Sequence, residues 1–331
     1  MILCYDDIAI TDIIGFYFFH VGYCLYGTMS EQELLKASEE GNLAQVEELL
    51  QRRISVNCRN RYDRTPLSLA SINGHFNVVQ CLIDAKAGLN TRDVFDETPL
   101  SRASLNGHLA AIGYLVEARA ALNTHDPYGR TPLFRASESG RTDVVQYLAR
   151  AKASLDTPDS DGDTPLLWVS ANGHLATVQC LIEAQASLDI PNSRGQTPLL
   201  RASVNGHLVF VQCLIDARAT IDTPDSRGRT PLSWASANGH LVVVQCLVKA
   251  GALIYACDKN NETPLDKSSK NPEMRKALMS SNQIWHPAIH SLASKTTQET
   301  IQTIMRIWSC QGCSITDLSP ELLFHIFNFL F

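Results

Sequence analysis

The chain has 331 residues, of which 45% are hydrophobic and 19% are charged, and its formal net charge is −6. The apolar fraction is typical of a folded chain with a buried core. The modest acidic balance argues against a protein that binds nucleic acid through its overall charge, although it does not exclude a local basic patch.

Residues 1–28 differ in composition from the rest of the chain. Residues 8–27 are rich in Ile, Phe and Tyr, aspartates lie in and beside them, and the first basic residue is Lys36. A signal peptide needs a positively charged start, and the longest uncharged run is short for a membrane span. We expect an extension without its own fold and a natural start near Met29. A membrane anchor, or a segment packed on the following residues, is the alternative.

A capping box is expected directly after this extension. Ser30 and Glu33 have the spacing of a helix N-cap and its reciprocal partner, and the apolar pair Leu34 and Leu35 follows. The first helix is therefore predicted to begin here.

The tripeptide Thr-Pro-Leu then recurs seven times at a constant interval of 33 residues. Such a period indicates one supersecondary unit stacked on itself. The threonine suits a helix N-cap, the proline suits the first helical position, and the leucine enters the core. The threonines are Thr65, Thr98, Thr131, Thr164, Thr197, Thr230 and Thr263.

One copy shows the order of elements within the unit. Asp225 and Gly228 have the spacing of a tight turn, and a short helix is predicted over Pro231–Ala237. Asn238-Gly239 ends that helix, and a second helix with apolar residues at helical spacing begins at His240. Elsewhere the Gly228 position is held by Gly129, Gly162, Gly195, Asp63, Asp96 and Asn261. These residue types tolerate a left-handed backbone, so each unit is predicted to be turn, helix, turn, helix.

The cysteines and histidines follow the repeat, which indicates packing roles rather than chemistry. Four of the ten cysteines share one position, so no disulfide framework is expected and a reducing, cytoplasmic location is favoured. Five of the ten histidines share the position that opens the second helix: His75, His108, His174, His207 and His240. Cys310 and Cys313 form a lone pair without a second pair or a histidine at zinc spacing. No metal site and no cofactor is predicted.

The period of 33, the Thr-Pro-Leu helix start, the Gly-His before the second helix and the Val-x-x-Leu within it resemble ankyrin repeats. The resemblance covers about residues 31–280 and implies an all-α solenoid of helix-turn-helix units with β-turn or hairpin tips. It divides the chain into an N-terminal capping repeat at 29–61, six full repeats at 62–259 and a C-terminal capping repeat at 260–280.

The chain departs from the family pattern in two ways. The histidine that usually follows Thr-Pro-Leu is absent, which removes a local hydrogen bond from each repeat. The glycine that usually ends the second helix is kept only at Gly251, and a non-glycine residue there costs about 1 kcal/mol. The replacements are Lys86, Arg119, Lys152, Gln185 and Arg218. They form either a row of solvated side chains whose positive charge suits the helix C-termini, or a continuous basic surface for an acidic partner.

Two positions vary between units whose other residues repeat: the turn tip, and the first-helix residue four places after the threonine. They carry aromatic residues and arginine, the types enriched in binding hot spots. The resemblance implies that both line a concave groove. The predicted partner-binding residues are Tyr62, Phe95, Arg102, Tyr128, Arg135, Trp168, Arg194, Arg201, Arg227 and Trp234. We expect the acidic part of the partner to face the later repeats. The alternative is that these residues are ordinary exposed ones and the partner binds elsewhere.

The period stops after residue 280. Residues 281–314 are predicted to be a linker with an amphipathic helix over Thr297–Trp308, and residues 315–331 are predicted to be an apolar helix that Ser319 caps.

The sequence Leu-Ser-Pro-Glu-Leu-Leu-Phe-His-Ile-Phe-Asn-Phe-Leu from Leu318 resembles the start of an F-box, with Ser319 in place of the usual proline. That resemblance implies docking to the adaptor subunit of a cullin ubiquitin ligase. The docking residues would be Leu318, Pro320, Leu322, Leu323, Ile326, Phe327 and Leu330. A helix that caps the solenoid, or a degenerate remnant, is the alternative.

No phosphate-binding glycine loop, metal-ligand run or nucleophile elbow is found in the sequence, so an enzyme is not expected. The sequence predicts a non-catalytic, monomeric scaffold that binds another protein in its groove and does not bind nucleic acid. A substrate-recruiting ligase adaptor is the second hypothesis. Membrane tethering through residues 8–27 is the third.

Overall fold

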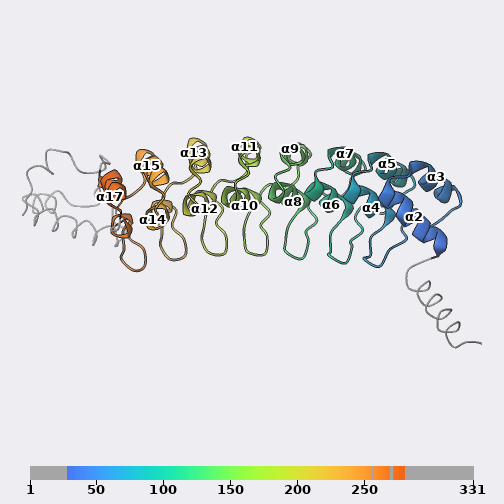
Figure 1. The fold of residues 1–331 in the computed structure, drawn as a ribbon, viewed down its shortest axis with the longest axis horizontal. Helices are drawn as coiled ribbons and strands as arrows, with labels where there is room; N and C mark the ends of the chain where they lie inside the picture. The colour runs from blue at the N-terminus through green and yellow to red at the C-terminus, as the bar shows by residue number, and fades with distance from the viewer. Residues whose placement is uncertain (1–27, 255, 269–270, 280–331) are drawn as a thin grey trace, which may run out of the picture. The chain divides into compact units, whose positions relative to one another are not determined.

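The computed structural model describes residues 28–254, 256–268 and 271–279, and these residues form sixteen helices and no strand. The chain divides into two compact units, residues 1–160 and 161–331. Each unit is a stack of helix pairs, with long loops projecting from the row of first helices (Figure 1). The N-terminal extension through residue 27 and the helices expected after residue 280 lie outside the described residues.

The first unit contains four helix pairs. Within it, each first helix packs on the next first helix, and each second helix packs on the next second helix. The pairs are α2 (Met29–Glu40) with α3 (Leu43–Gln51), α4 (Pro66–Asn73) with α5 (Phe76–Asp84), α6 (Pro99–Asn106) with α7 (Leu109–Glu117), and α8 (Pro132–Glu138) with α9 (Thr142–Arg150).

The second unit repeats this arrangement, again with first helices on first helices and second on second. Its pairs are α10 (Pro165–Asn172) with α11 (Leu175–Glu183), α12 (Pro198–Val204) with α13 (Leu208–Asp216), α14 (Pro231–Ala237) with α15 (Leu241–Lys249), and α16 (Pro264–Lys267) with α17 (Pro272–Met279). The prediction of an all-α repeat of helix-turn-helix units is confirmed.

The Thr-Pro-Leu tripeptide has the predicted structural role in every copy. Each threonine is the N-cap of a first helix and accepts a hydrogen bond from the N–H three residues later, as in the 3.2 Å bond from Ser68 N to Thr65 Oγ1. Each proline is the first helical residue, and leucines such as Leu67 are fully buried. The motif therefore both starts the helix and anchors it in the core.

The histidines that open the second helices tie neighbouring repeats together. His75 Nε2 lies 2.9 Å from the carbonyl oxygen of Glu39, one repeat earlier, and Asn73 donates to the same oxygen. His108, His207 and His240 make the equivalent contact. Gly41 is required beneath this ring, because its φ is 77° and an added Cβ would lie 2.5 Å from His75 Nδ1.

Two expectations are corrected. The N-cap of α2 is Thr28 rather than Ser30, because the Glu31 carboxylate accepts from the Thr28 N–H at 2.7 Å while Thr28 Oγ1 accepts from the Glu31 N–H. Five described cysteines are free thiols, but Cys257 is disulfide-bonded, contrary to the absence of disulfides expected from the sequence. Disulfide pairing depends on tertiary proximity, which cysteine spacing alone does not reveal.

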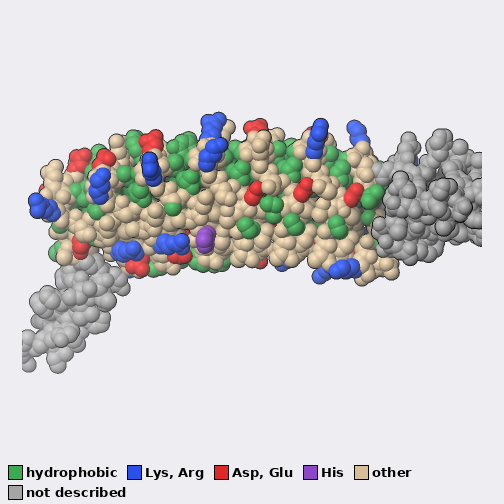
Figure 2. Space-filling view, turned by 180° about the vertical axis from the view of Figure 1, so that it is seen from behind, with side chains coloured by type: hydrophobic (Ala, Val, Ile, Leu, Met, Phe, Trp, Pro, Cys, Tyr) green, Lys and Arg blue, Asp and Glu red, His purple; other side chains and the backbone are tan. Residues whose placement is uncertain are grey.

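The departures from the family pattern have the expected consequences. The hydroxyls of Ser68, Ser101 and Ser233 are buried and have no hydrogen-bond partner within the described part of the chain. Lys86 and Arg218 adopt positive φ, at 65° and 70°, and are exposed. Figure 2 shows Lys and Arg side chains projecting among Asp and Glu side chains along the edge that carries the second helices. This mixture of charges favours the row of solvated side chains over a continuous basic surface.

Candidate partner-binding surface

Six turn tips are each organised by one Asp or Asn side chain, of which the sequence analysis names only Asp225 as a turn residue. Asp93 Oδ1 accepts from the N–H groups of Phe95 at 2.9 Å and Glu97 at 3.1 Å, which closes the loop on itself. The same double acceptor is formed by Asn60, Asp126, Asn192, Asp225 and Asp258. Their spacing in multiples of 33 residues is visible in the sequence and could have identified the other five.

Neighbouring tips are also joined to each other by backbone hydrogen bonds. In the first unit, Val94 N donates to Tyr62 O at 3.0 Å and Ser160 N donates to Tyr128 O at 2.7 Å. In the second unit, the donors are Ser193, Ser226 and Lys259 and the acceptors are Asp161, Arg194 and Arg227. At the equivalent donor position opposite Phe95 stands Pro127, which has no N–H. Within the described residues of each unit, every pair of neighbouring tips is therefore joined by such a bond except the pair at Phe95 and Pro127.

The tips of the first unit present three aromatic rings to solvent. Tyr62, Phe95 and Tyr128 are 39%, 54% and 61% exposed. A guanidinium lies against each ring: Arg102 is 5.2 Å from the Phe95 centroid and Arg130 is 4.7 Å from that of Tyr128. Arg61 and Arg64 lie against Tyr62. Cation–π contacts hold the rings in place while leaving much of their surface uncovered.

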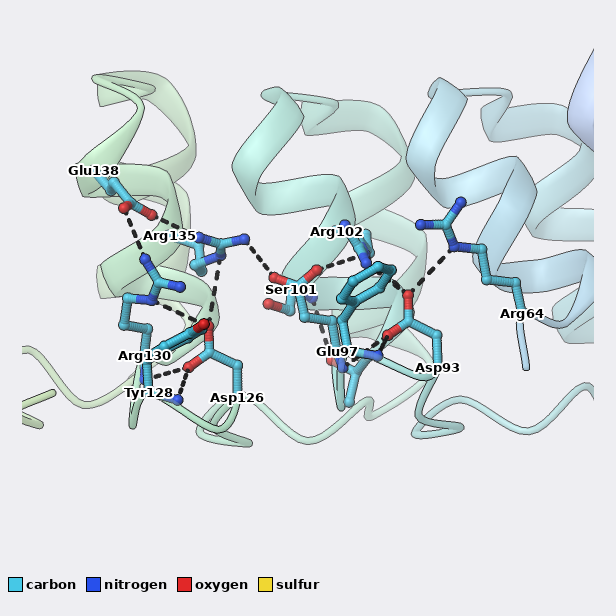
Figure 3. Close-up of polar contacts among 12 residues, drawn as sticks. Arg64, Asp93, Glu97, Ser101, Arg102, Asp126, Tyr128, Arg130, Arg135 and Glu138 are labelled. Carbon is cyan, nitrogen blue, oxygen red and sulfur yellow. Dashed lines mark hydrogen bonds and ion pairs between the residues drawn. The ribbon is translucent and has the colours of Figure 1, made fainter. Parts of the chain in front are cut away.

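Behind the rings, Arg102 and Arg135 are engaged in ion pairs on the first-helix face (Figure 3). Arg102 Nη2 lies 2.7 Å from Asp93 Oδ2, and Arg102 Nε lies 2.5 Å from Glu97 Oε2 in a close pair that is not aligned as a hydrogen bond. Arg135 Nη2 reaches Oε1 of the same Glu97 at 2.5 Å. The two arginine side chains are only 15% and 13% exposed.

The network continues along the first unit. Glu138 receives Arg135 Nη1 at 2.7 Å and Arg130 Nη1 at 2.9 Å, and Arg130 Nε lies 3.1 Å from Asp126 Oδ2. Arg64 Nε contacts Asp93 at 3.3 Å. Four arginines thereby meet four carboxylates, and the face behind the aromatic tips is neutral and fixed.

The electrostatics agree with this geometry. Burial alone would raise the pKa of Asp93, but the hydrogen bonds from Arg102 and from the Glu97 and Phe95 N–H groups outweigh burial and lower it. For Arg135, burial opposes the charge, yet Glu97 and Glu138 raise its pKa. Both groups are therefore held in their ionised forms.

The second unit fills the same positions differently. The Trp234 indole Nε1 donates to Asp225 Oδ2 at 3.0 Å, and the Arg229 guanidinium lies 3.6 Å from the Trp234 ring centroid. Tryptophan thus takes the place that Arg102 holds in the first unit. Arg194 and Arg227 are exposed at the tips, while Trp168 and Arg201 are partly buried. All ten residues predicted from the sequence belong to the tips or to the first-helix face behind them.

A hollow of about 480 Å³ adjoins Tyr62 at the start of the first unit. It lies between α2 and the first tip, and its lining includes Leu35, Lys36, Arg61 and Arg64. The size falls in the range of pockets that hold a side chain or a small ligand. In the described ranges, no cluster of side chains could hold a metal ion and no helix is both long and apolar enough to cross a bilayer.

Comparison with known proteins gives one match. A family model described as ankyrin repeats (3 copies) matches residues 34–126, 86–159, 151–225 and 210–287. The comparison with curated proteins finds no match. The F-box resemblance after residue 314 has no support from the family models. Since the matched segments span residues 34–287, well over half of the chain, the chain belongs to the ankyrin repeat family, whose repeats generally serve as non-catalytic protein-interaction modules.

Proposed function

We propose that this protein binds a partner protein on the surface formed by its turn tips and the exposed face of its first helices. The observation that carries the proposal is the set of three half-exposed aromatic rings, Tyr62, Phe95 and Tyr128. Each is held by a guanidinium and stands on a loop closed by an Asx turn. Rings that are fixed before binding lose little conformational freedom on contact, which favours affinity.

The arginines behind the rings act as positioning residues in this proposal. Arg102 and Arg135 are committed to Asp93, Glu97 and Glu138, so their charge is already neutralised within the chain. Their contribution to binding is to hold Phe95 and the first-helix face. In the second unit, the exposed Arg194 and Arg227 contact the acidic part of the partner.

The test is to purify the partner on the full chain, identify it by mass spectrometry and measure its Kd for tip variants. Phe95→Ser and Tyr128→Ser are each expected to weaken binding at least about ten-fold, because a buried aromatic anchor contributes about 2 kcal/mol or more. The matched control is Val242→Ser on α15, which is 53% exposed but lies on a second helix. Equal Kd values for the tip variants, the control and the natural chain would contradict the proposal.

A second candidate function rests on the sequence after residue 314, which lies outside the described residues. The F-box-like match from Leu318 to Leu330 favours a ligase adaptor that presents the bound partner for ubiquitination. Pull-down of the cullin adaptor subunit with the full chain, and with a chain ending at residue 314, tests it. Equal recovery with both chains would exclude this function.

Membrane tethering through residues 8–27 is tested separately, because those residues also lie outside the described ones. Cell fractionation of chains that start at Met1 and at Met29 compares the two forms. An anchor requires that only the longer form enters the membrane fraction.

A further inference from the structure

The first-helix position four residues after the threonine carries arginine in both units, but the residues that could neutralise it differ. Arg102 is paired with Asp93, nine residues earlier, and with Glu97, five residues earlier. At Arg201 the corresponding residues are Asn192 and Gln196. Both carboxylates are thus replaced by amides of similar size, which preserves the turn but removes the negative charge.

The contacts around Arg201 show the effect of these replacements. Within the described part of the second unit, Arg201 makes no ion pair, and its Nε is buried without an acceptor. Asn192 Oδ1 accepts the N–H groups of Arg194 and Gln196, both at 3.0 Å, so it closes the turn as Asp93 does. Gln196 is only 8% exposed, and its Oε1 also has no partner in that part of the chain.

Within the described residues, no acidic group of the neighbouring repeats forms an ion pair with Arg201. Asp163, in the preceding repeat, accepts Asn192 Nδ2 at 2.7 Å. Asp225, in the following repeat, accepts Trp234 Nε1 at 3.0 Å and lies 3.4 Å from Arg229. Where Arg135 has Glu138 three residues later, Arg201 has Val204. No carboxylate on α12 or its turn is therefore available to this cation.

The neighbours of Arg201 on either side are aromatic. α12 packs against both α10 and α14, and these helices carry Trp168 and Trp234 at the same repeat position. An unpaired charge that is partly removed from water between large side chains is costly, and an external anion offsets that cost. A carboxylate matches the planar donors of a guanidinium and forms strong charge-assisted hydrogen bonds with it.

We propose that Arg201 is the receptor for an Asp or Glu side chain of the protein partner. The partner's carboxylate supplies the negative charge that Asp93 and Glu97 supply to Arg102 in the first unit. Arg194 and Arg227, exposed on the tips of the same and the following repeat, add positive charge toward the approaching acid. The inference rests on the proposed function, because it assigns the partner's chemistry at one position of the proposed surface.

The experiment uses the full chain with ¹⁵N-labelled arginine and follows the Nε–H resonances by NMR. The probe is the peptide acetyl-Ala-Glu-Ala-amide, compared with its Gln and phosphoserine counterparts and with inorganic phosphate. The glutamate peptide is expected to shift the Arg201 resonance saturably, and the Gln peptide is not. Arg201→Gln assigns the resonance. The variant Gln196→Glu places an acid where the first unit has Glu97, and it is expected to weaken binding of the glutamate peptide at least ten-fold. Asn192 is kept, because its amide donates to Asp163.

The outcomes separate this inference from the proposed function. Absence of a saturable shift, an equal shift with the Gln peptide, or unchanged binding in Gln196→Glu would overturn it. A response to the phosphoserine peptide or phosphate, but not to the glutamate peptide, would overturn it in favour of a phosphate site. Because Gln196→Glu adds an internal ion pair and changes no turn hydrogen bond, it should keep the far-ultraviolet circular dichroism of the natural chain. Phe95→Ser and Tyr128→Ser test the tips independently and leave peptide binding at Arg201 unchanged.

Discussion

The first and second units are built from the same pair of helices, but the arginines on their first-helix faces have different partners. In the first unit, Glu97 accepts Arg102 from its own repeat and Arg135 from the next, so that charges cancel inside the protein. In the second unit, Gln196 stands at the same position in the repeat of Arg201. Asp163, which holds this position one repeat earlier, forms no ion pair with Arg201 in the described residues. The difference shows that a repeat can keep its fold while one amide or carboxylate decides whether an arginine is paired inside the protein.

The largest expected effect comes from removing the shared acid of the first unit. Glu97→Ala leaves two nearly buried guanidinium groups without their carboxylate and should lower the free energy of unfolding by about 3 kcal/mol. The matched change in the second unit, Gln196→Ala, should cost about 1 kcal/mol or less. Urea denaturation measures both, and hydrogen exchange should place the Glu97→Ala effect in α6 and α8. Equal losses of unfolding free energy in the two variants would show that the first-helix faces of the two units do not differ in this respect.

The pH dependence of stability should have opposite signs for one aspartate in each unit. The folded-state pKa of Asp93 is lowered, so its ionised form stabilises the protein above the unfolded value of 3.8, and this contribution is lost as the pH falls through the folded pKa. The difference in unfolding free energy between the natural chain and Asp93→Asn should be present at neutral pH and shrink below about pH 4.

Asp222 of the second unit provides the opposite case. Burial raises its pKa despite the hydrogen bond from the Leu253 N–H, so the folded state holds its proton more tightly. Its contribution to stability should fall as the pH rises from the ordinary value of 3.8 through the raised one. The stability of Asp222→Asn relative to the natural chain should therefore rise with pH. The same direction of change for Asp93→Asn and Asp222→Asn would contradict the difference between the two aspartates.

Trp234 offers a smaller test of how the second unit replaces arginine. Trp234→Phe removes the indole N–H that Asp225 accepts and should cost about 1 kcal/mol. Trp234→Arg recreates the contact of Arg102 with Asp93 and should cost less than Trp234→Phe in thermal unfolding. If the binding surface extends over this unit, Trp168→Ala and Trp234→Ala should also weaken binding of the purified partner. Unchanged Kd values for both variants would restrict binding to the first unit.

The smallest effect is expected where the tips of the first unit lack a hydrogen bond. Pro127→Ala supplies an N–H opposite the Phe95 carbonyl and should change stability by only about 0.5 kcal/mol, because the added bond is offset by a more flexible unfolded chain. Ser226→Pro removes the bond that the second unit makes to Arg194 and should cost about 1 kcal/mol. Amide exchange at the tips measures both changes.

Much of the local structure followed from residues close together in sequence. The Thr-Pro-Leu helix starts, the Pro231–Ala237 helix and the left-handed Asp63 and Lys86 positions are as predicted, because caps and turns are decided within a few residues. The α2 cap was misplaced by two residues because Thr28 and Ser30 both precede an acid at capping-box spacing.

The groove was predictable as a set of positions but not as a set of interactions. Variation between repeats pointed to Arg102, Arg135 and Arg201 together, and the sequence argument treated all three as binding residues. Their different surroundings depend both on residues a few positions earlier, as for Arg102, and on acids far away in sequence, such as Glu97, which is 38 residues before Arg135. Spacing alone does not show which of these pairs meet.

By itself, the sequence determined the repeating unit, its helices, its turns and its membership of the ankyrin repeat family. Those features arise from local hydrogen bonds and from a period of 33 residues that each copy reproduces. Only the tertiary structure decided that the arginines of the first unit are neutralised while Arg201 of the second is not. The physical reason is that ion pairs form across stacked loops and helices, where a single carboxylate or amide at the right distance sets the charge that remains for a partner.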